Sequence, residues 1–588
     1  MQMRWFSLCL FLLYARPGID LRKAEMHFIV QPPSRFLQAK ITYEFTAQDS
    51  ILIWDFGRGL ELISWQASFP VQSIQRDTLR QTLTFVAATA LSGGRHTLTV
   101  QYVGEPRSTG FGSFEVKDHA TGYVLWTLSQ PYGARDWLFC QDDLSDKVDT
   151  LSITVETPPD YLGVGNGRLL ADSLTGYGTR VRHFVHHYPI ATYLIAIAAS
   201  NYAVQTYTIS TPFHSYTLTN YIFPQDTARA RDLTAFILPY FSWIEEKLGP
   251  YPFADEGYAQ VQMGWGGGME HQTVTFFGSF SPELWAHELA HQWFGDLVTC
   301  GSWQDIWLNE AFATLLGGKV YEALPTGLWP RWRYLVILAA WRDTANTIFV
   351  PDTADYRRIF SYPTTYAKGA IALEMLREFL EDEPFWRGLR QYLADYRYGF
   401  ARTADFARSV QPHWGTPNTQ TFLQSWIYQP HFPQVVIQWE TPSQCLVNPL
   451  RPYPMKLSLH LYFSTESTPQ IQNISLLHQE ILTSSAPVSR ISIDPDTTTP
   501  FYKPRYILPP ASPLLLYPNP TSGRHFLLWP TPPHRLSVYD SSGQLQWTQD
   551  LAEPVSEISL SALPAGVYYL LMETAEETFC EKVIKISP

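Results

Sequence analysis

Apolar and polar residues alternate with a period of two in a series of short runs between about residue 20 and residue 205. Gly, Pro, Asp and Ser separate these runs, as they separate the strands of antiparallel sheets. Examples are AKITYEFTA (39–47), HTLTVQYVG (96–104), DTLSITVETP (149–158) and ATYLIAIAAS (191–200). The pattern predicts a mostly antiparallel β domain over residues 19–205.

The spacing of apolar residues becomes helical after about residue 206. The run ARARDLTAFILPYFSWIEEKLGPYPF (228–253) predicts a helix that Pro239 breaks or kinks and that Gly249 and Pro250 stop. A second helix is expected in WLNEAFATLLGG (307–318), and a third from about Tyr366 onwards. We therefore predict a mostly helical domain over residues 206–432.

One segment of this helical region has the pattern of strands instead. YAQVQMGWGGGMEHQTVTFF (258–277) is strand-like but contains three successive glycines, Gly266, Gly267 and Gly268. Glycines in a strand indicate either that another backbone approaches closely, as an extended peptide would, or that the chain forms a bulge or turn. The glycines alone favour neither interpretation.

Strand patterns resume at Gln434 and predict a small β-sandwich over residues 433–500. A proline-rich linker is expected at 501–512 because TTTPFYKPRYILPPASP spans this boundary. The remaining residues, 513–588, contain short strands separated by Asn-Pro, Ser-Gly and Pro-Ala-Gly turns, which predict a separate β module.

The first 18 residues have the form of a signal peptide. Arg4 precedes an apolar run from Trp5 to Tyr14, which is too short to span a bilayer. A buried first strand is the alternative, because the residues around Ala15 make a poor cleavage site. Since no other stretch approaches membrane-spanning length, we expect a soluble, exported protein without a transmembrane segment.

Composition narrows the class of protein. A length of 588 residues allows three or four domains, and a hydrophobic content of 45% supplies ample core. The formal charge of −12 excludes a nucleic-acid-binding protein, since phosphate contacts need a basic surface. The five cysteines are scattered without a CxxC pair, so disulfides are possible but a cysteine zinc site is not expected.

Two histidines four residues apart stand in HELAHQWFGD (287–296). On an α-helix, His287 and His291 project from one face and can bind a single metal ion. Glu288 lies beside them, where it can act as a general base on a metal-bound water. Catalytic zinc has three protein ligands, and Glu310, in the predicted helix 307–318, is the candidate for the third.

The alternative to a metal site is a surface helix that carries two histidines and a glutamate by chance. Leu289, Trp293 and Phe294 argue against it, because they make the helix part of the core, where ionisable groups need partners or a metal. A second group, His183, His186 and His187, lies in a predicted strand. Alternation sends His186 to the opposite face from the other two, which favours ordinary strand histidines.

These motifs resemble those of the aminopeptidase N family of gluzincin zinc aminopeptidases. In HELAHQWFGD, His291 is followed after 18 residues by Glu310, and the motif is preceded by GGGME and followed by TTYAKG. The resemblance covers about residues 25–500 and implies a multidomain α+β fold. It consists of a saddle-like N-terminal β domain, a mostly helical thermolysin-like catalytic domain and a small β-sandwich, without the long C-terminal helical domain of many members.

The resemblance also implies a role for each matching residue. His287, His291 and Glu310 would bind one Zn²⁺, and Glu288 would be the general base. Glu270 would bind the free α-amino group of the substrate, with Gln130 as a second amine anchor. Tyr366 would stabilise the tetrahedral intermediate, although Tyr362 lies one turn away. Gly267, Gly268 and Met269 would line the substrate, and His271 replaces the usual Asn after Glu270.

The C-terminal module resembles the sorting domain of the type IX secretion system of Bacteroidetes. The similarity rests on YPNPTSG, VYDSSG, PAGVYYL and a final strand that contains Lys. A carbohydrate-binding or generic β-sandwich appendage is the alternative. The resemblance makes the secretion machinery an expected partner and places the protein outside the cell or on its surface.

The expected function is therefore that of an exported zinc aminopeptidase acting on peptides with a free N-terminus. A thermolysin-like zinc endopeptidase is a second possibility, but it would have no use for an amine anchor at Glu270. A non-catalytic secreted peptide-binding protein is a third, yet the ligands and the base are all present.

Overall fold

The computed structural model describes residues 18–144, 146–441, 443–463, 469–484, 488–493, 505–507, 515–517, 524–528, 534–551, 557–573 and 578–585. Nearly all of the expected signal peptide lies outside these residues. The chain divides into two compact units: residues 1–302 with 396–401, and residues 303–395 with 402–588. No helix among the described residues is long and apolar enough to cross a membrane.

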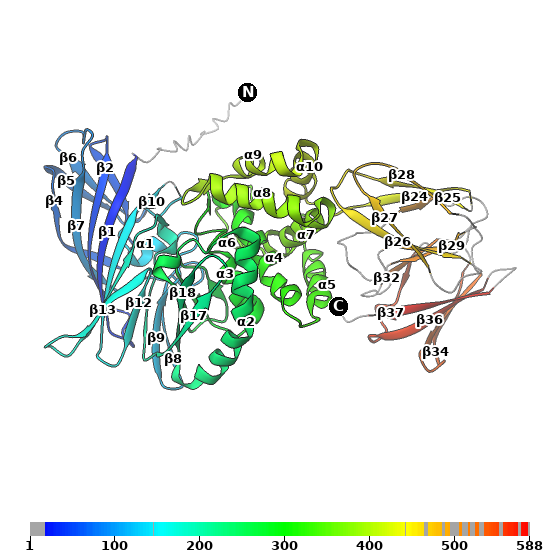
Figure 1. Ribbon diagram of the computed structural model, residues 1–588, viewed down its shortest axis with the longest axis horizontal. Coiled ribbons are helices and arrows are strands. Elements are labelled where there is room, and N and C mark those ends of the chain that lie inside the picture. The colour runs from blue at the N-terminus through cyan, green and yellow to red at the C-terminus, as the bar shows by residue number, and fades with distance from the viewer. Residues whose placement is uncertain are drawn as a thin grey trace, which may run out of the picture. The chain divides into compact units, whose positions relative to one another are not determined.

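A seven-stranded sheet forms the largest part of the N-terminal β domain (Figure 1). Its strands, in spatial order, are β13 (Arg168–Leu174), β14 (Arg180–His186), β11 (Thr150–Thr157), β1 (Ile19–Val30), β2 (Leu37–Ala47), β7 (His96–Gly104) and β4 (Leu60–Ala67). All neighbours are antiparallel except β1 and β11. Buried and more exposed residues alternate along β11, as the sequence pattern predicts for a sheet with one covered face.

Smaller sheets complete this domain. Their strands are β3 (Ile51–Asp55), β6 (Thr82–Ala87) and β5 (Val71–Asp77); β12 (Leu162–Gly165), β16 (Ile197–Ser200), β9 (Gly122–Thr127) and β8 (Phe114–His119); and the pair β10 (Lys147–Val148) and β15 (Ile190–Ala191). The strand expected over 191–200 is only partly correct, because a 3₁₀ turn at Thr192–Leu194 interrupts it. The sheets enclose fully buried aromatic residues, among them Trp54, Trp126 and Trp137.

A five-stranded mixed sheet lies in the same unit. Its order is β17 (Ala203–Ser210), β18 (Ser215–Ile222), β19 (Tyr258–Gln262), β21 (Val274–Phe277) and β20 (Gly268–Met269). Helices α2 (Thr227–Leu248) and α3 (Pro282–Ala290) belong to this unit too. Of the predicted break or kink at Pro239, the break is wrong, because α2 continues through this residue. The predicted stop at Gly249 is confirmed, with φ at 100°.

The second unit begins with helices. They are α4 (Trp307–Ala323), α5 (Trp329–Ala340), α6 (Tyr356–Ile359), the π-helix η5 (Tyr362–Lys368), α7 (Gly369–Leu380), α8 (Asp382–Asp395), α9 (Thr403–Trp414), α10 (Thr416–Phe422) and the π-helix η6 (Leu423–Ile427). Aromatic rings join them, including that of Trp307, whose centroid lies 5.3 Å from that of Phe406. The expected start of a helix near Tyr366 is four residues late, because η5 already begins at Tyr362.

Strands resume after the helices, as the sequence predicts. The small β domain contains β24 (Val435–Thr441), β25 (Gln444–Pro449), β26 (Lys456–Phe463), β27 (Gln470–Ser475), β28 (Glu480–Thr483) and β29 (Val488–Ile493). Part of the expected linker, Arg505–Ile507, forms β30 and pairs with β24. The other residues of the expected linker, 501–504 and 508–512, lie outside the described residues.

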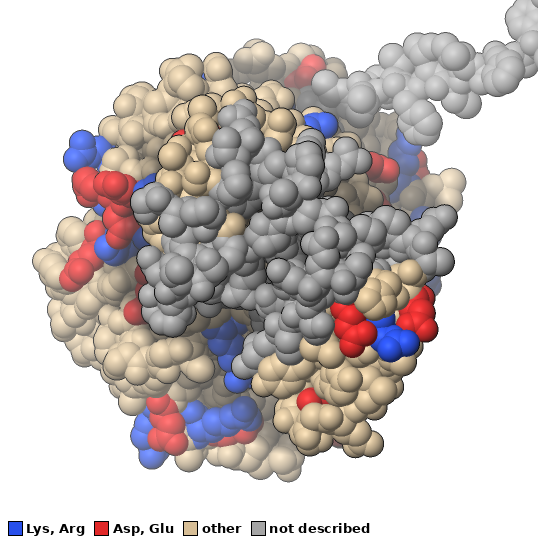
Figure 2. All heavy atoms as spheres, turned by 90° about the vertical axis from the view of Figure 1, so that its right-hand side faces the viewer, with Lys and Arg blue, Asp and Glu red and all other residues tan. Residues whose placement is uncertain are grey.

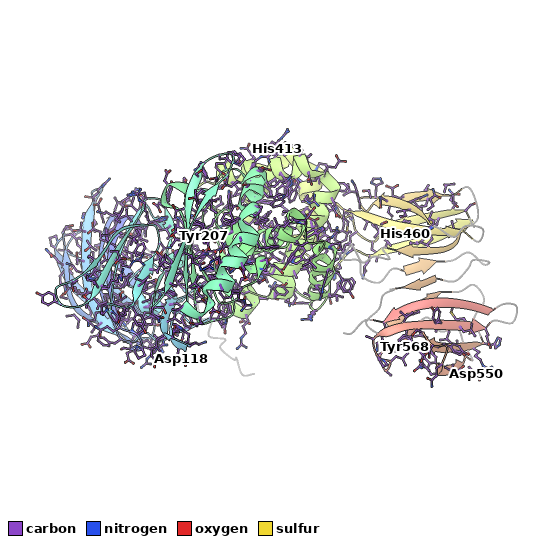
Figure 3. The ribbon with its side chains drawn as sticks, turned by 60° about the horizontal axis from the view of Figure 1, so that its bottom comes forward. Asp118, Tyr207, His413, His460, Asp550 and Tyr568 are labelled. Atoms are coloured by element: carbon purple, nitrogen blue, oxygen red, sulfur yellow. The ribbon has the colours of Figure 1, made fainter. Side chains whose placement is uncertain are left out.

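The C-terminal module is also built of strands. These are β31 (Leu515–Tyr517), β32 (Arg524–Leu528), β33 (Arg535–Asp540), β34 (Leu545–Asp550), β35 (Glu557–Ser559), β36 (Gly566–Glu573) and β37 (Thr578–Lys585). Val538, Leu570 and Met572 belong to its buried cluster, and the hydroxyl of Tyr568, labelled in Figure 3, donates to the Pro564 carbonyl oxygen at 2.9 Å. On the face drawn in Figure 2, basic and acidic side chains are interspersed among the described atoms rather than gathered by sign.

Candidate active site

The end of helix α3 positions two imidazoles. Ser281 caps the helix by accepting from the Leu284 backbone N–H, and the chain keeps helical dihedrals through His291, one residue past the last helical residue. The Nε2 atoms of His287 and His291 are therefore 3.0 Å apart. The Nδ1–H of His291 donates to the Phe294 carbonyl oxygen at 2.9 Å, so Nε2 of His291 is the nitrogen that carries the lone pair.

This pair of nitrogens fits a zinc ion. Two nitrogens at about 2.0–2.1 Å from tetrahedral zinc would lie about 3.3 Å apart, close to the separation observed. His291 is buried and His287 is half-buried, so one ligand is fixed in the core while the other remains nearer to solvent. The tautomer of His291 is the one that metal-binding histidines use.

The turn after His291 is held by unusual backbone bonds. The N–H groups of Asp296, Leu297 and Val298 donate to the carbonyl oxygens five residues earlier, at 3.0, 3.2 and 3.3 Å. Lys147, on β10, donates its Nζ–H to the Asp296 carbonyl oxygen at 2.8 Å. Burial lowers the pKa of Lys147 to about 7, and burial followed by the nearby Glu270 raises the pKa of Asp296 well above its usual range.

Three acidic or basic side chains converge in the first unit. The ligand atoms of Glu270, Glu288 and His291 all lie within 4.8 Å of one another, and each residue is at most 3% exposed. Burying two carboxylates so close together is costly unless a cation or a proton is shared between them. The arrangement therefore has the character of a cation-binding site.

Glu270 has partners from the N-terminal β domain. The Nε2–H of Gln130 donates to Oε1 of Glu270 at 2.9 Å, across 140 positions of sequence. The Tyr193 hydroxyl lies 3.5 Å from the same oxygen and is 2% exposed. Sequence reasoning missed Tyr193, because in an apolar run it has no signal other than that of a core aromatic residue.

Of the glycines before Glu270, Gly268 lies against the Glu288 side chain. A Cβ atom on Gly268 would stand 2.1 Å from Oε1 of Glu288, and one on Gly267 would stand 2.5 Å from the Trp265 ring. Gly268 and Met269 form β20, which pairs with β21 at Phe277 and Phe276. The atoms that approach Gly268 belong to a side chain rather than to another backbone, and a Cβ on Gly266 would meet nothing within 4 Å, so the approach of a peptide backbone stays a prediction.

His271, which stands where the aminopeptidase N motif has Asn, is accommodated by packing. Its ring is fully buried and meets the Phe276 ring edge-on, with centroids 4.4 Å apart. Neither ring nitrogen has a hydrogen-bond partner among the described residues, and burial lowers the pKa of His271 to about 3. His271 is thus a neutral packing residue, and the backbone of its loop is closed by the Val274 N–H, which donates to the His271 carbonyl oxygen at 2.9 Å.

Glu310 and Tyr366 lie in the second unit. Glu310 is 2% exposed in the first turn of α4. Tyr366 is half-buried in the π-helix η5, and its ring stacks on that of the exposed Tyr362 with centroids 5.9 Å apart. The burial of Glu310 is what a metal-binding carboxylate requires, and the roles of both residues remain predictions.

The histidine group of the N-terminal domain is not a metal cluster. His186 is buried and pairs closely with Glu256, whereas the Nδ1 atom of His183 is 3.0 Å from the Thr154 hydroxyl. His187 follows the end of β14 and is exposed. The predicted separation of His186 from its neighbours is confirmed.

Three family models match parts of this chain. Residues 281–426 match the peptidase family M1 domain, and residues 58–194 match the peptidase M1 N-terminal domain. Residues 515–586 match a secretion system C-terminal sorting domain.

Individual relatives agree with these matches. The chain is 35% identical over 162 residues to a leucyl aminopeptidase of Saccharolobus solfataricus, covering 26% of this chain and 20% of that protein. It is 26% identical over 396 residues to endoplasmic reticulum aminopeptidase 1 of Rattus norvegicus, covering 60% and 40%. The chain thus spans less than half the length of these curated relatives.

A solved structure shares the fold. It is a mutant M1 zinc metallopeptidase from Deinococcus radiodurans with a bound Tyr-Ser-Ala substrate, 21% identical, with a TM-score of 0.60 over 71% of this chain and 96% of that one. The predicted order of a β domain, a mostly helical catalytic region and C-terminal strands is therefore correct. The chain carries the N-terminal and catalytic domains of peptidase family M1, the family of aminopeptidase N, followed by a secretion-system sorting domain.

Proposed function

We propose that this protein is an exported zinc aminopeptidase that removes N-terminal residues from peptides. The observation that carries the proposal is the convergence of Glu270, Glu288 and His291 within 4.8 Å. One extended residue spans about 3.5 Å, so a substrate ammonium held by Glu270 leaves room for only one residue before the carbonyl that faces Glu288. An endopeptidase would need space for further residues at this position.

The metal site consists of His287, His291 and Glu310 in this proposal. Two neutral imidazoles and one carboxylate are a donor set that catalytic zinc uses. The 3.0 Å separation of the two Nε2 atoms and the burial of Glu310 support the assignment. When bound, zinc supplies the Lewis acidity that makes water a nucleophile near neutral pH.

Each of the other site residues has its own role in the proposed reaction. Glu288 accepts a proton as water attacks the scissile carbonyl and then transfers it to the leaving nitrogen. Tyr366 donates its hydroxyl hydrogen to the carbonyl oxygen as negative charge develops there. Glu270 holds the charged α-amine, and the amide oxygen of Gln130 accepts a second hydrogen bond from it, because the Gln130 N–H already donates to Glu270.

The sorting domain indicates export through a type IX secretion system. We propose that the N-terminal apolar run delivers the chain across the inner membrane as a signal peptide. The secretion machinery then recognises residues 513–588, so that the enzyme acts on peptides outside the cell or at its surface.

The proposal is tested with paired substrates. The wild-type enzyme is expected to cleave an aminoacyl-anilide and to leave its N-acetylated counterpart intact, because acetylation removes the cation that Glu270 binds. Activity is expected to disappear with a chelator and to return with Zn²⁺. Equal cleavage of both substrates would indicate an endopeptidase, and full activity after complete metal removal would refute the metal assignment.

One variant distinguishes the proposed general-base role of Glu288 from metal binding. Glu288→Gln is expected to keep its zinc, measured by metal analysis, while kcat falls at least about 1,000-fold, since general-base catalysis and orientation of the attacking water are lost together. Unchanged turnover would contradict the role of Glu288.

A further inference from the structure

The short loop that carries Glu270 contains a strained residue. We call residues 270–273 the anchor loop. Thr273 has φ at +66°, in the left-handed region, although β-branched residues rarely adopt this conformation. Such outliers persist only where surrounding contacts hold them, and they concentrate at functional sites.

The N-terminal β domain holds the anchor loop from one side. Asn166, in the turn between β12 and β13, is fully buried. Its Nδ2 group donates to the Gln272 carbonyl oxygen at 2.8 Å and to the Leu194 carbonyl oxygen at 2.9 Å, while its Oδ1 atom accepts from the Ala196 N–H at 2.8 Å. One amide thus ties the anchor loop to the segment that carries Tyr193, whose hydroxyl faces Glu270.

Neighbouring contacts fix Thr273 itself. The Gly167 N–H donates to the Thr273 hydroxyl oxygen at 2.8 Å. On the other side, the Thr273 N–H donates to Oε1 of Gln292 at 2.9 Å, and Gln292 directly follows His291. The Thr273 carbonyl oxygen accepts from the Ala259 N–H at 2.8 Å. The anchor loop is therefore held between the N-terminal β domain and the end of α3.

We propose that Asn166 is a positioning residue for the amine anchor, and that the strained Thr273 is the point through which it acts. The inference rests on the proposed function, because it takes Glu270 to be the group that binds the substrate ammonium. Asn166 holds the Gln272 carbonyl two residues from Glu270, and it fixes the backbone from which that carboxylate reaches Gln130. A displaced carboxylate binds the ammonium more weakly, because a charge-assisted hydrogen bond depends on its geometry.

The consequence concerns specificity. A loosened anchor loop leaves the two histidines at the end of α3 in place but weakens the binding of the free amine by Glu270. The expected signature is a rise in KM for amine-bearing substrates, with zinc content retained. If Asn166 had only a structural role, its replacement would lower the thermal stability without a specific rise in KM at constant zinc content.

Two variants and one control test this. Asn166→Ala removes all three side-chain hydrogen bonds. Thr273→Gly removes the hydroxyl but suits a positive φ, so its folding is not strained. Asn220→Ala is the matched control, because Asn220 is also fully buried and donates to the Thr234 hydroxyl at 2.8 Å, between β18 and α2.

The measurements are kcat and KM on an aminoacyl-anilide, inhibition by a free amino-acid amide, zinc content and thermal midpoint. Asn166→Ala and Thr273→Gly are expected to raise KM and the amide inhibition constant about tenfold or more, with kcat within about threefold and zinc content unchanged. Thr273→Gly is expected to do so with a thermal midpoint at or near that of the wild type. Asn220→Ala is expected to change only the thermal midpoint.

Unchanged KM and amide inhibition in Thr273→Gly would overturn the inference, and so would a loss of zinc in step with activity. If Asn166→Ala does not fold, the Thr273→Gly result alone decides. Failure of the proposed function is distinguishable, because it would appear in the wild type as equal cleavage of free and N-acetylated substrates. A wild type that discriminates, with variants that keep its KM, would refute only the role of Asn166.

Discussion

Gly268 faces Glu288 so closely that no side chain fits between them. A Cβ atom there would stand 2.1 Å from Oε1 of Glu288, which is the mobile end of that side chain. The carboxylate would move rather than the backbone, so the side chain that we propose as the general base would leave its place while the fold stays intact. In the proposed mechanism, glycine is therefore required at this residue for catalysis rather than for folding.

We expect Gly268→Ala to lower kcat/KM at least about 100-fold, because the displaced base no longer reaches the attacking water. The thermal midpoint should change little. Gly266→Ala is the matched control, since a Cβ there meets nothing within 4 Å, and it should remain close to the wild type. Kinetics of both variants on one aminoacyl-anilide check this, and a Gly268→Ala enzyme of normal activity would contradict it.

At the level of single residues, sequence reasoning succeeded where chemistry restricts the residue type. Gln130 and Glu270, which were both expected to bind the substrate amine, lie within hydrogen-bond distance of each other, and His287 meets His291. Tyr193 and Asn166 were not predicted, because neither stands in a motif and because tyrosine and asparagine are ordinary in strands and turns.

Helices α4 and α7 are joined by ion pairs inside the second unit. Lys319 on α4 and Glu374 on α7 are 2.9 Å apart with side chains 1% and 0% exposed, and Arg377 reaches Glu374 at 2.8 Å. Burial alone would raise the pKa of Glu374, but Lys319 and Arg377 outweigh it and lower this pKa to about 2. The charged carboxylate therefore stabilises the folded state.

We expect Glu374→Gln to lower the free energy of unfolding by about 3 kcal/mol at pH 7, because Lys319 then lacks its main partner. Since the folded pKa is below the unfolded value near 4.5, the stabilisation is complete above pH 4.5 and is lost as pH falls towards 2. Urea unfolding at pH 7 and pH 3.5 should show the difference between wild type and variant shrinking. Glu383→Gln, in an exposed pair with Arg387, is the control, and a constant difference would contradict the prediction.

Among the elements, long amphipathic helices and alternating strands were predictable from periodicity. The failures share a local cause. Pro239 was expected to break or kink α2, but the helix continues through it. The π-helix η5 has a hydrogen-bond pattern that a 3.6-residue period does not reveal. The strand over 191–200 is interrupted at Thr192–Leu194, where the segment carrying Tyr193 is bound by Asn166.

At the scale of the whole molecule, two functions follow each other along the chain. The peptidase M1 domains match residues 58–194 and 281–426, and the sorting domain matches residues 515–586. The order of these parts was predictable because composition and turn residues change between them. The exact boundaries remain predictions.

Removal of residues 513–588 is expected to retain peptidase activity and to abolish export. The cut leaves β30 in place, which pairs with β24 and so completes the small β domain. Activity assays on cell fractions and medium from a bacterium with a type IX system check the result. Secretion of the truncated protein at the wild-type level would contradict the assigned role of the module.

The first unit is completed by a segment from much later in the chain. Residues 396–401 belong to it, and β23 (Phe400–Ala401) pairs in parallel with β22 (Thr299–Cys300), which follows shortly after His287 and His291 in the sequence. During synthesis, residues 1–302 therefore leave the ribosome before residues 396–401, which complete the unit, have been made. Its last strand pair closes only when residue 401 has emerged, after the helices α4 to α8 have been made. A nascent chain stalled before that point would contain His287 and His291 but would lack β23, the partner of the strand β22 that follows these histidines in the sequence.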